Sequence, residues 1–592
     1  ITPDGSGSVI MEFSGKELIK GEADASSFPN GGLRSTFEAR GYTAWDMSSY
    51  AFIKDGTLCI PTVFLSYGGE SLDKKTPLLK SEELIEKQAK RLLHLLGKEV
   101  DSVITTVGAE QEYFLIDKKM YYKRKDLVYT GRTLFGNRPP KTQELDDHYF
   151  GVIKPRVLSF MKELNEECWK LGIPAKTQHN EVAPCQHELA PIFTLTNRAC
   201  DQNQIIMELM KKIADKHDLV CLLHEKPFNG INGSGKHNNW SMSADGENLL
   251  SPKGRDEQFL LFLVAIIQAV DEYPELLRIA AASAGNDHRL GGHEAPPAVL
   301  SVFIGHDLEE RIQNFIYNKK TENSSNTSLN MDVHSLPKFF QDTSDRNRTS
   351  PFAFTGNKFE FRMLGSSQSI ACSNINLNTA VAEILCRFAD RLENTSGNLL
   401  EEIRNVIRES YENHKRIIFN GDGYADEWIE EAKRRGLLNL PTTADTLPCY
   451  LNQKNIELFE RHKIFTASEL RSRYEILLEN YNNVNSIEAY TMLSIVRKQI
   501  LPSAMEYLKF LSDTLNAKSA AVPGVNNSVE ADLIQEINTI YTSAYQNTKK
   551  LSDAMEVCER ENKQEEAYYF KDVILPLMND LRKDCDSLET IT

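Results

Sequence analysis

The sequence predicts an α+β fold that is divided among several domains. Short β-favouring runs, separated by Gly- and Pro-bounded polar stretches, recur from the N-terminus to about residue 362, with amphipathic helices between them. From about residue 396 onward only helical periodicity remains. Because 592 residues are too many for one ordinary core, we expect an N-terminal domain at 1–98, a central domain at 99–395 and a helical extension at 396–592.

The composition is typical of a soluble globular protein. The net charge of −16 argues against a protein that mainly binds nucleic acid or anionic membranes. The longest apolar run, at 259–270, is too short to span a bilayer and predicts a buried helix. The ten cysteines contain no CxxC pair, which favours reduced thiols and a cytoplasmic location, and the N-terminal residues show no secretory pattern.

The N-terminal domain is expected to combine strands with one helix. Strand-like pieces lie at 8–13 and 57–65, a turn signal lies at 29–32, and helical spacing covers 81–96. The polar and aromatic stretch 41–49 contains Asp46. By itself this stretch fits a packed turn in which Ser and Asp side chains satisfy backbone groups.

Two carboxylates mark the first strand of the central domain. Glu110 and Glu112 lie two residues apart in the β-favouring segment 103–116, so their side chains point to the same face. Neighbouring carboxylates are costly unless something positive lies between them. Alone, the pair fits a charged face on an edge strand as well as it fits a metal site.

The next segments predict a helix and then a turn that carries two further acids. Helical spacing at about 154–171 places one apolar stripe at Val157, Phe160, Met161, Leu164 and Cys168. Segment 178–188 then places Glu181 and Glu188 on either side of Pro184, which predicts two extended arms meeting at a turn. With the earlier pair, these acids make a four-carboxylate set suited to Mg²⁺ or Mn²⁺.

A glycine-rich loop follows at 230–241. Its glycines allow the backbone to approach a ligand closely. Gly230, Gly235 and Lys236 match the spacing of a P-loop, but His237 stands where a P-loop needs Ser or Thr, and no clear helix start follows. A lone histidine is more often structural than a ligand. Here, however, His237 lies in a chain whose four carboxylates already fit a metal site.

Basic residues appear where an anionic substrate would need them. Arg289 and Glu294 lie in a Gly/Pro-bounded loop at 286–297, ahead of a strand at 298–304. Arg346 and Arg348 precede the segment Lys358, Glu360 and Arg362, whose side chains share one strand face. This pattern fits a solvated face, or acids and arginines that converge on metal and phosphate.

The helical extension carries no comparable motif. Residues 466–469 (TASE) form a capping box, and helical spacing follows. Pro502 and Pro576 are expected to kink or break two later helices. We expect this region to serve packing or assembly.

Taken in order, these motifs resemble those of glutamine synthetase. The series consists of 108–112 (GAEQE), 180–188 (NEVAPCQHE), 232–237 (NGSGKH), Arg289 with Glu294, 346–348 (RNR) and 360–362 (EFR). The stretch 31–46 and the helical C-terminal extension resemble the type III branch. The resemblance implies a β-grasp-like N-terminal domain and a catalytic domain on a curved antiparallel sheet with flanking helices, which forms half of a funnel between subunits.

The resemblance also implies site residues. Glu112, Glu181 and Glu188 would hold one divalent cation, and Glu110, His237 and Glu360 the other. Glutamate would be bound by Asn232, Gly233 and Arg289, and ATP by Asn239, Ser241, Arg348 and Lys358. Arg362 would stabilise the transferring phosphoryl group. Glu294, and Asp46 from a neighbouring subunit, would take a proton from ammonium.

The implied reaction joins ammonia to L-glutamate through a γ-glutamyl phosphate, with ATP and two or more Mg²⁺ or Mn²⁺ ions, in a homo-oligomer of hexameric rings, a dodecamer. A carboxylate is a poor electrophile, so it must first be activated, and metals and arginines meet the charge of the phosphoryl group in transfer. Closure over the acyl phosphate would exclude water.

Three features depart from the family pattern. Arg289 and Glu294 are one residue closer than in the commoner branches, no arginine lies between Arg348 and Lys358, and Met47 replaces the glycine of an Asp-Gly-Ser-Ser loop. Two other functions stay open: a related ligase that takes a larger amine, and a catalytically silent relative. The six expected metal ligands and the Glu294 loop favour the ammonia ligase.

Overall fold

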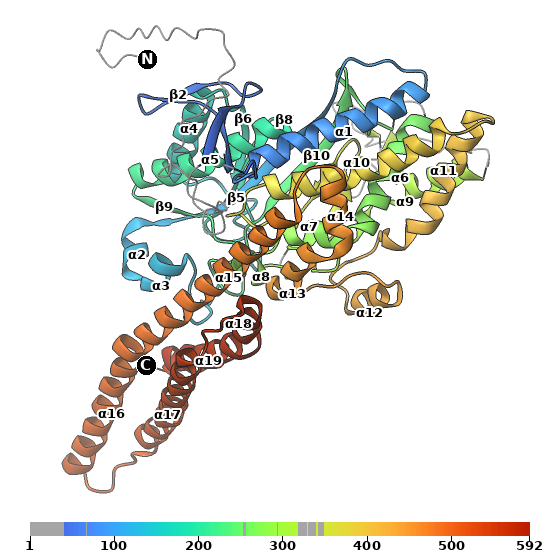
Figure 1. Cartoon of the computed structure of the whole chain (residues 1–592). Coiled ribbons are helices and arrows are strands. Elements are labelled where there is room, and N and C mark those ends of the chain that lie inside the picture. Colours follow the sequence, from blue (N-terminus) through green and yellow to red (C-terminus); the bar gives the residue numbers. More distant parts are fainter. Residues whose placement is uncertain are drawn as a thin grey trace.

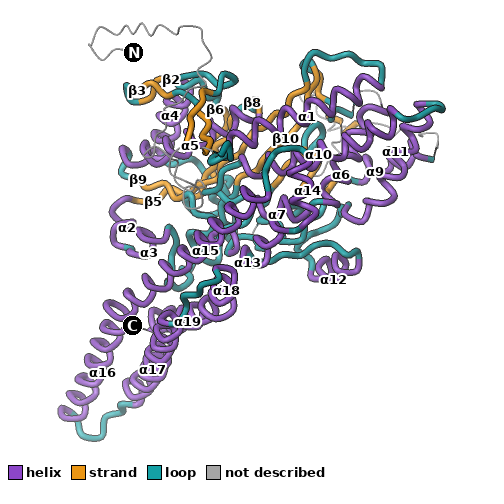
Figure 2. The backbone as a smooth tube through the Cα atoms, viewed as in Figure 1, coloured by secondary structure: helices purple, strands orange, loops and turns teal. Residues whose placement is uncertain are grey.

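The computed structural model describes residues 41–66, 68–252, 256–292, 294–317, 328–329, 339–340 and 349–591 (Figure 1). A body of sheet and helices makes up most of the molecule, and a pair of long helices from the C-terminal part projects from it (Figures 1 and 2). Among the described residues, no helix is both long enough and apolar enough to cross a membrane. All ten cysteines are free thiols.

Four short strands and one helix precede the large sheet. β1 (Gly41–Trp45) pairs antiparallel with β4 (Thr62–Ser66), and β2 (Phe52–Lys54) pairs with β3 (Thr57–Cys59). Asp55 and Gly56 join β2 to β3 with φ angles of 53° and 74°, as a type I′ hairpin turn requires. The predicted strand at 57–65 is therefore two strands, and the predicted pieces at 8–13 and 29–32 lie outside the described residues. α1 (Lys75–Leu95) begins before the predicted residue 81, since Pro77 is tolerated in a first turn.

A ten-stranded sheet forms the centre of the body, with the strand order β12-β15-β16-β10-β5-β7-β6 and with β8, β9 and β11 attached. Its strands are β5 (Val103–Asp117), β6 (Ala175–Asn180), β7 (Gln186–Pro191), β8 (Thr194–Leu195), β9 (Leu219–Leu222), β10 (Lys236–Ala244), β11 (Glu247–Asn248), β12 (Val302–Phe303), β15 (Phe352–Phe354) and β16 (Phe359–Phe361). A separate pair is formed by β13 (Ser328–Leu329) and β14 (Phe339–Phe340). The expected antiparallel sheet is in fact mixed, because β12 runs parallel to β15.

Helices cover this sheet through two apolar cores. α6 (Asp256–Glu272) and α10 (Ala371–Glu393) share the larger core with α1 and with sheet residues such as Trp240. The predicted buried helix at 259–270 is confirmed as part of α6. α4 (Pro155–Lys170) and α5 (Thr196–Lys216) pack against Tyr113 and Leu115 of β5. The five residues of the predicted stripe are the buried residues of α4.

Most of the remaining helices of the body are short. They are α2 (Lys118–Lys123), α3 (Lys125–Thr130), α7 (Pro274–Ala280), α8 (Ala284–Asp287), α9 (His306–Ile316), α11 (Leu399–His414), a 3₁₀ turn (Lys415–Ile417), α12 (Asp426–Arg434), α13 (Thr443–Thr446), a 3₁₀ turn (Leu447–Leu451) and α14 (Gln453–Arg461). Ile403, Tyr450 and Leu470, among other buried residues after 395, belong to the same core as α6 and α10. Apolar packing is thus continuous across residue 395, and the domain boundaries stay a prediction.

The C-terminal helices pack in a further apolar core, which also includes Leu134, Phe135, Ala282 and Ala284 of the body. These helices are α15 (Ala467–Ile495), α16 (Leu501–Ala521), α17 (Ser528–Glu556), α18 (Lys563–Tyr569) and α19 (Leu575–Ile591). The predicted capping box is confirmed at the start of α15, where Thr466 and Glu469 each bond the other's backbone N–H.

Pro502 and Pro576 do not break their helices. A π-helical turn precedes each proline, at Val496–Ile500 and at Phe570–Ile574, and the chain stays helical through it. A wider turn accommodates the missing N–H and the bulk of the proline ring, which is why the expected break is absent.

Candidate active site

The strand register brings distant acids to one part of the sheet. Where β5 pairs with β7, Glu112 lies opposite Glu188, and where β5 pairs with β10, Glu110 lies opposite His237. On the next strand, β16 carries Glu360. Each of these side chains comes from a different strand position, and only the pairing of the strands makes them neighbours.

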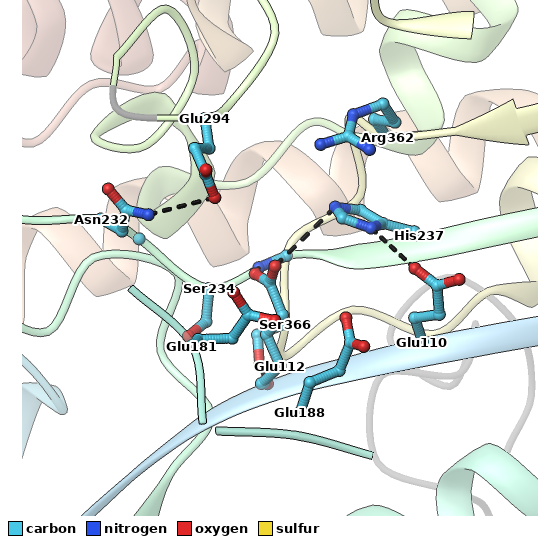
Figure 3. A network of polar contacts seen from close by, with 12 residues as sticks. Glu110, Glu112, Glu181, Glu188, Asn232, Ser234, His237, Glu294, Arg362 and Ser366 are labelled. Atoms are coloured by element: carbon cyan, nitrogen blue, oxygen red, sulfur yellow. Dashed lines mark hydrogen bonds and ion pairs between the residues drawn. The ribbon is translucent and has the colours of Figure 1, made fainter. Parts of the chain in front are cut away.

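His237 is the centre of the first group of contacts. Its Nδ1 atom lies 2.9 Å from Glu110 Oε2 and 3.3 Å from Glu360 Oε1, and its Nε2 atom lies 3.8 Å from Glu112 Oε1. Figure 3 shows the imidazole of His237 above the side chains of Glu110 and Glu112. The structure therefore brings Glu110, Glu112 and Glu360 around one buried histidine.

The glycine-rich loop before His237 leads into a strand. A P-loop must lead into a helix, whereas Lys236 is the first residue of β10. The match of Gly230, Gly235 and Lys236 to a P-loop is thus a coincidence of spacing.

Glu181 and Glu188 meet at a histidine that the sequence reasoning missed. β6 and β7 form a hairpin whose turn contains Pro184, as predicted. His179 Nε2 lies 3.0 Å from Glu188 Oε1, and His179 Nδ1 lies 3.6 Å from Glu181 Oε1. The available signal was the spacing, since His179 lies two residues before Glu181 on an extended arm.

The acids strongly influence one another's ionisation. Burial, followed by the charges of Glu112 and Glu188, raises the pKa of Glu181 to about 8. Burial also acts to raise the pKa of Glu110, but the hydrogen bond and charge of His237 outweigh it and lower that pKa to about 2. The pKa of His237 rises to about 9, because the surrounding carboxylates outweigh its burial. The carboxylates of this site therefore carry more negative charge than the neighbouring basic side chains neutralise.

The donor set fits hard divalent cations. Among the described residues, two groups have ligand atoms that all lie within 4.8 Å of one another: Glu110, Glu188 and His237, and His179, Glu181 and Glu188. Glu188 belongs to both groups, whereas Glu112 and Glu360 lie beside them. Oxygen-rich, partly buried sites with excess negative charge suit Mg²⁺ or Mn²⁺.

Asn232 and Glu294 form a second feature at one end of the acid cluster (Figure 3). Asn232 Nδ2 donates to Glu294 Oε2 at 3.2 Å. Glu294 has a φ of 65°, a left-handed conformation that is uncommon for glutamate and often occurs at functional sites. The carbonyl of Gly233 accepts a hydrogen bond from Gln186, so its own position is fixed by β7.

Arg289 lies beneath the glycine loop. Its guanidinium donates at 3.3–3.4 Å to the backbone carbonyls of residues 362, 363 and 364. A Cβ atom on Gly235 would lie 2.0 Å from Arg289 Nη2, so this close approach requires glycine.

Two of the buried guanidinium nitrogens that have no hydrogen-bond partner among the described atoms lie at this site. They are Nε of Arg289 and Nε of Arg362. Arg362 Nη1 donates to Glu360 Oε1 at 2.8 Å, which places this arginine beside the His237 cluster (Figure 3). Unsatisfied buried donors are costly, and an anionic ligand would satisfy them.

Of the residues predicted to bind ATP, Asn239 and Ser241 lie on β10, the neighbour of β5, and Lys358 lies just before β16. Asn239 donates to Glu110 Oε1 at 2.9 Å, and Ser241 donates to the carbonyl of residue 357 at 2.8 Å. Lys358 is half-buried, and its charge contributes to lowering the pKa of Glu110. Arg348 lies outside the described residues.

Asp46 lies in a different network. Its carboxylate accepts hydrogen bonds from the backbone N–H and hydroxyl of Ser48 and from Asn197, and it forms an ion pair with Lys75 at 2.9 Å. Burial opposes its ionisation, but these donors hold the pKa of Asp46 well below its usual range. The structure brings Asp46 to α1 and α5 of its own chain and not into contact with the described His237 cluster.

Comparison with known proteins gives a consistent result. Three family models match: the type III N-terminal glutamine synthetase region at 1–81, the glutamine synthetase catalytic domain at 87–300 and the glutamine synthetase C-terminal domain at 402–519. The Type-3 glutamine synthetase of Dictyostelium discoideum is 45% identical over 99% of this chain and 82% of its own length. A glutamine synthetase of Butyrivibrio fibrisolvens is 47% identical over 93% of this chain and 79% of its own length.

Among solved structures, a cryo-EM Plasmodium falciparum glutamine synthetase covers 78% of this chain and 87% of its own, with a TM-score of 0.49 and 13% identity. The sequence relatives span most of both chains at far higher identity. On that ground, the chain belongs to the type III branch of the glutamine synthetase family, the ligases that make glutamine from glutamate and ammonia.

Proposed function

We propose that this chain ligates ammonia to L-glutamate with ATP, through a γ-glutamyl phosphate, at the cluster around His237. The observation that carries the proposal is the convergence of three carboxylates on that imidazole, with Arg362 bonded to one of them. Acids that cage cations, beside an arginine with an unsatisfied donor, suit in-line phosphoryl transfer.

The cations would be held by the six predicted ligands, Glu110, Glu112, Glu181, Glu188, His237 and Glu360. Divalent cations bound there supply charge to neutralise the phosphate oxygens during transfer. His179 joins this set through its contact with Glu188. The raised pKa of Glu181 supports the proposal, because crowded acids need added positive charge to ionise together.

Substrates would bind on either side of this cluster. Asn232, Gly233 and Arg289 would hold glutamate, and the free Nε of Arg289 is a donor for its α-carboxylate. ATP would lie towards Asn239, Ser241, Lys358 and Arg348. Arg362 would then orient and neutralise the phosphoryl group between the two substrates.

The second half-reaction needs a proton acceptor for ammonium. Glu294 suits this task, since it lies beside the glutamate site and is oriented by Asn232. Asp46 would contribute from a neighbouring subunit. Lys75 and Asn197 hold Asp46 away from the His237 cluster of the same chain, which supports a role for Asp46 at the site of a neighbouring subunit.

The finer architecture follows from the same proposal. Two chains would build each funnel-shaped site from a β-grasp-like domain of one and the sheet of the other, in hexameric rings that stack into a dodecamer. Ten free thiols suit a reducing, cytoplasmic compartment.

The test is glutamine formation by the purified chain with ATP, Mg²⁺, glutamate and ammonium. Hydroxylamine in place of ammonium should yield the γ-glutamyl hydroxamate. Phosphate release that needs no glutamate, or faster turnover with a bulky amine than with ammonium, would contradict the proposal. Glu188→Gln is the matched negative control, because it keeps the shape and removes the charge shared by both cation groups.

A further inference from the structure

The segment that leaves β16 carries Arg362 and runs to α10. Two backbone hydrogen bonds hold residues 362–368, which we call the arginine segment, against the start of β10: Lys236 N to Leu364 O at 2.9 Å and Ser366 N to Ser234 O at 3.2 Å. The hydroxyl of Ser366 also donates to the carbonyl of Glu112 at 2.7 Å. The arginine segment therefore packs against the parts of β5 and β10 that carry the acid cluster.

Glu225 holds the middle of the arginine segment from a fully buried position. Its residue is 2% exposed, and its carboxylate accepts hydrogen bonds from both the backbone N–H and the hydroxyl of Ser367. Gly285 and Gly365 leave room for this carboxylate, since a Cβ atom on either would lie within 2.4 Å of the Glu225 side chain. Burying a carboxylate whose hydrogen-bond donors are neutral lowers the stability of the fold. A functional role would explain why Glu225 is nevertheless present at this position.

Lys236 holds the end of the same segment. It is fully buried, and its ammonium donates to the carbonyl of Gln368 and to Asn203 Oδ1 at 3.0 Å. Gln368 in turn accepts from Gly365 N at 2.7 Å, which closes a short loop. The side chains of Glu225 and Lys236 thus bond two adjacent residues, 367 and 368, of one segment.

Arg289 connects the contacts of Glu225 and Lys236 to the proposed glutamate site. Its guanidinium donates to the carbonyls of residues 362, 363 and 364, so the position of the arginine segment decides where this guanidinium lies. Arg362 is part of the segment itself and reaches Glu360. Any shift of residues 362–368 moves both arginines together.

We propose that Glu225 and Lys236 are positioning residues, which hold the arginine segment so that Arg289 meets glutamate and Arg362 meets the transferring phosphoryl group. The inference rests on the proposed function and adds two residues to it. The alternative is that these buried groups serve only the stability of the fold. The two accounts differ in which kinetic constants respond, because Asn239 and Ser241 of the ATP side lie further along β10 and Lys358 lies before β16, and their hydrogen bonds and charge go to Glu110 and Asn357 and not to the arginine segment.

The decisive variants are Glu225→Leu, Lys236→Met and the milder Ser367→Ala, measured in the full chain. We expect Glu225→Leu and Lys236→Met to raise the KM for glutamate about tenfold and to lower kcat, with the KM for ATP changed less than about twofold, since small displacements of binding groups cost this much or more. Ser367→Ala, which leaves the backbone donor in place, should raise the KM for glutamate about two- to threefold.

Glu275→Leu is the matched control. Glu275 is a buried acid, 5% exposed, that pairs with Lys454 at 2.7 Å and does not touch the arginine segment. Its loss should lower the melting temperature and leave both KM values within about twofold.

Either of two results overturns the proposal: a KM for glutamate within twofold of wild type in Glu225→Leu and Ser367→Ala, or equal rises in the KM for glutamate and for ATP. If Glu225→Leu does not fold, Ser367→Ala decides, because position 367 is exposed. A wild-type chain that forms no glutamine would sink the proposed function itself. An active wild type with unchanged variants sinks only the positioning role.

Discussion

Replacing Glu181 by glutamine should make the metal-free protein more stable at pH 8. Burial and the charges of Glu112 and Glu188 raise the pKa of this carboxyl from 4.5 to about 8 in the folded chain. Between these two values the unfolded chain loses the proton while the folded chain keeps it. Stability therefore falls as pH rises from about 4.5 to about 8, because the folded state binds more protons.

The size of the effect follows from the shift. Each pKa unit corresponds to about 1.36 kcal/mol, so a rise from 4.5 to about 8 sets a ceiling of about 5 kcal/mol at pH 8. Solvent and monovalent counter-ions entering the site reduce this, and we expect about 1–3 kcal/mol. For a cooperative unit of this length that is a melting-temperature rise of about 1–3 °C.

The assay is thermal unfolding of wild type and Glu181→Gln at pH 5 and pH 8, with a chelator or with excess Mn²⁺. In chelator the variant should melt higher than wild type at pH 8, and the difference should vanish at pH 5. With Mn²⁺ the order should reverse, since the cation stabilises the ionised wild-type site more strongly. Gln143→Leu, a half-buried residue bonded to Asn232, serves as control and should show no pH-dependent difference. A variant that melts no higher than wild type in chelator at pH 8 would refute the reasoning.

Four further outcomes are expected. Arg362→Gln should lower kcat by about 10²–10³, read from phosphate release, because it removes a donor aimed at developing charge; a loss below tenfold would contradict the role. Glu294→Gln should raise the KM for ammonium by at least about tenfold and leave the KM for ATP unchanged, and equal effects on both would count against it. Thr466→Ala should cost about 1 kcal/mol through loss of the capping box, seen as a lower melting temperature with normal kinetics. Arg132→Met should lower the free energy of unfolding by about 3–5 kcal/mol, because it leaves the Glu488 carboxylate, whose side chain is 2% exposed, buried and unpaired. Proteolysis of the C-terminal helices should then be faster. The double variant Arg132→Met with Glu488→Leu should recover much of the lost stability.

Local patterns in the sequence predicted individual elements well. The apolar stripe of α4 and the buried α6 follow from helical spacing and apolar content within one segment, and the capping box at Thr466 follows from residues three apart. Local rules decided less where packing between distant segments took over. Of the kink or break expected at Pro502, the break is absent, because a π-helical turn and packing in the core of the C-terminal helices keep the chain helical there.

By itself the sequence determined which side chains could serve a divalent-cation site, and, through the order of its motifs, the family. It could not determine which acid faces which, because a strand's own residues do not encode its partner or its register. Tertiary structure alone placed Glu188 opposite Glu112, added His179 to the acids, and committed Asp46 to Lys75 and away from its own cluster. The reason is physical: the carboxylate pattern is local chemistry, whereas a shared cation site exists only once strands far apart in the chain have paired.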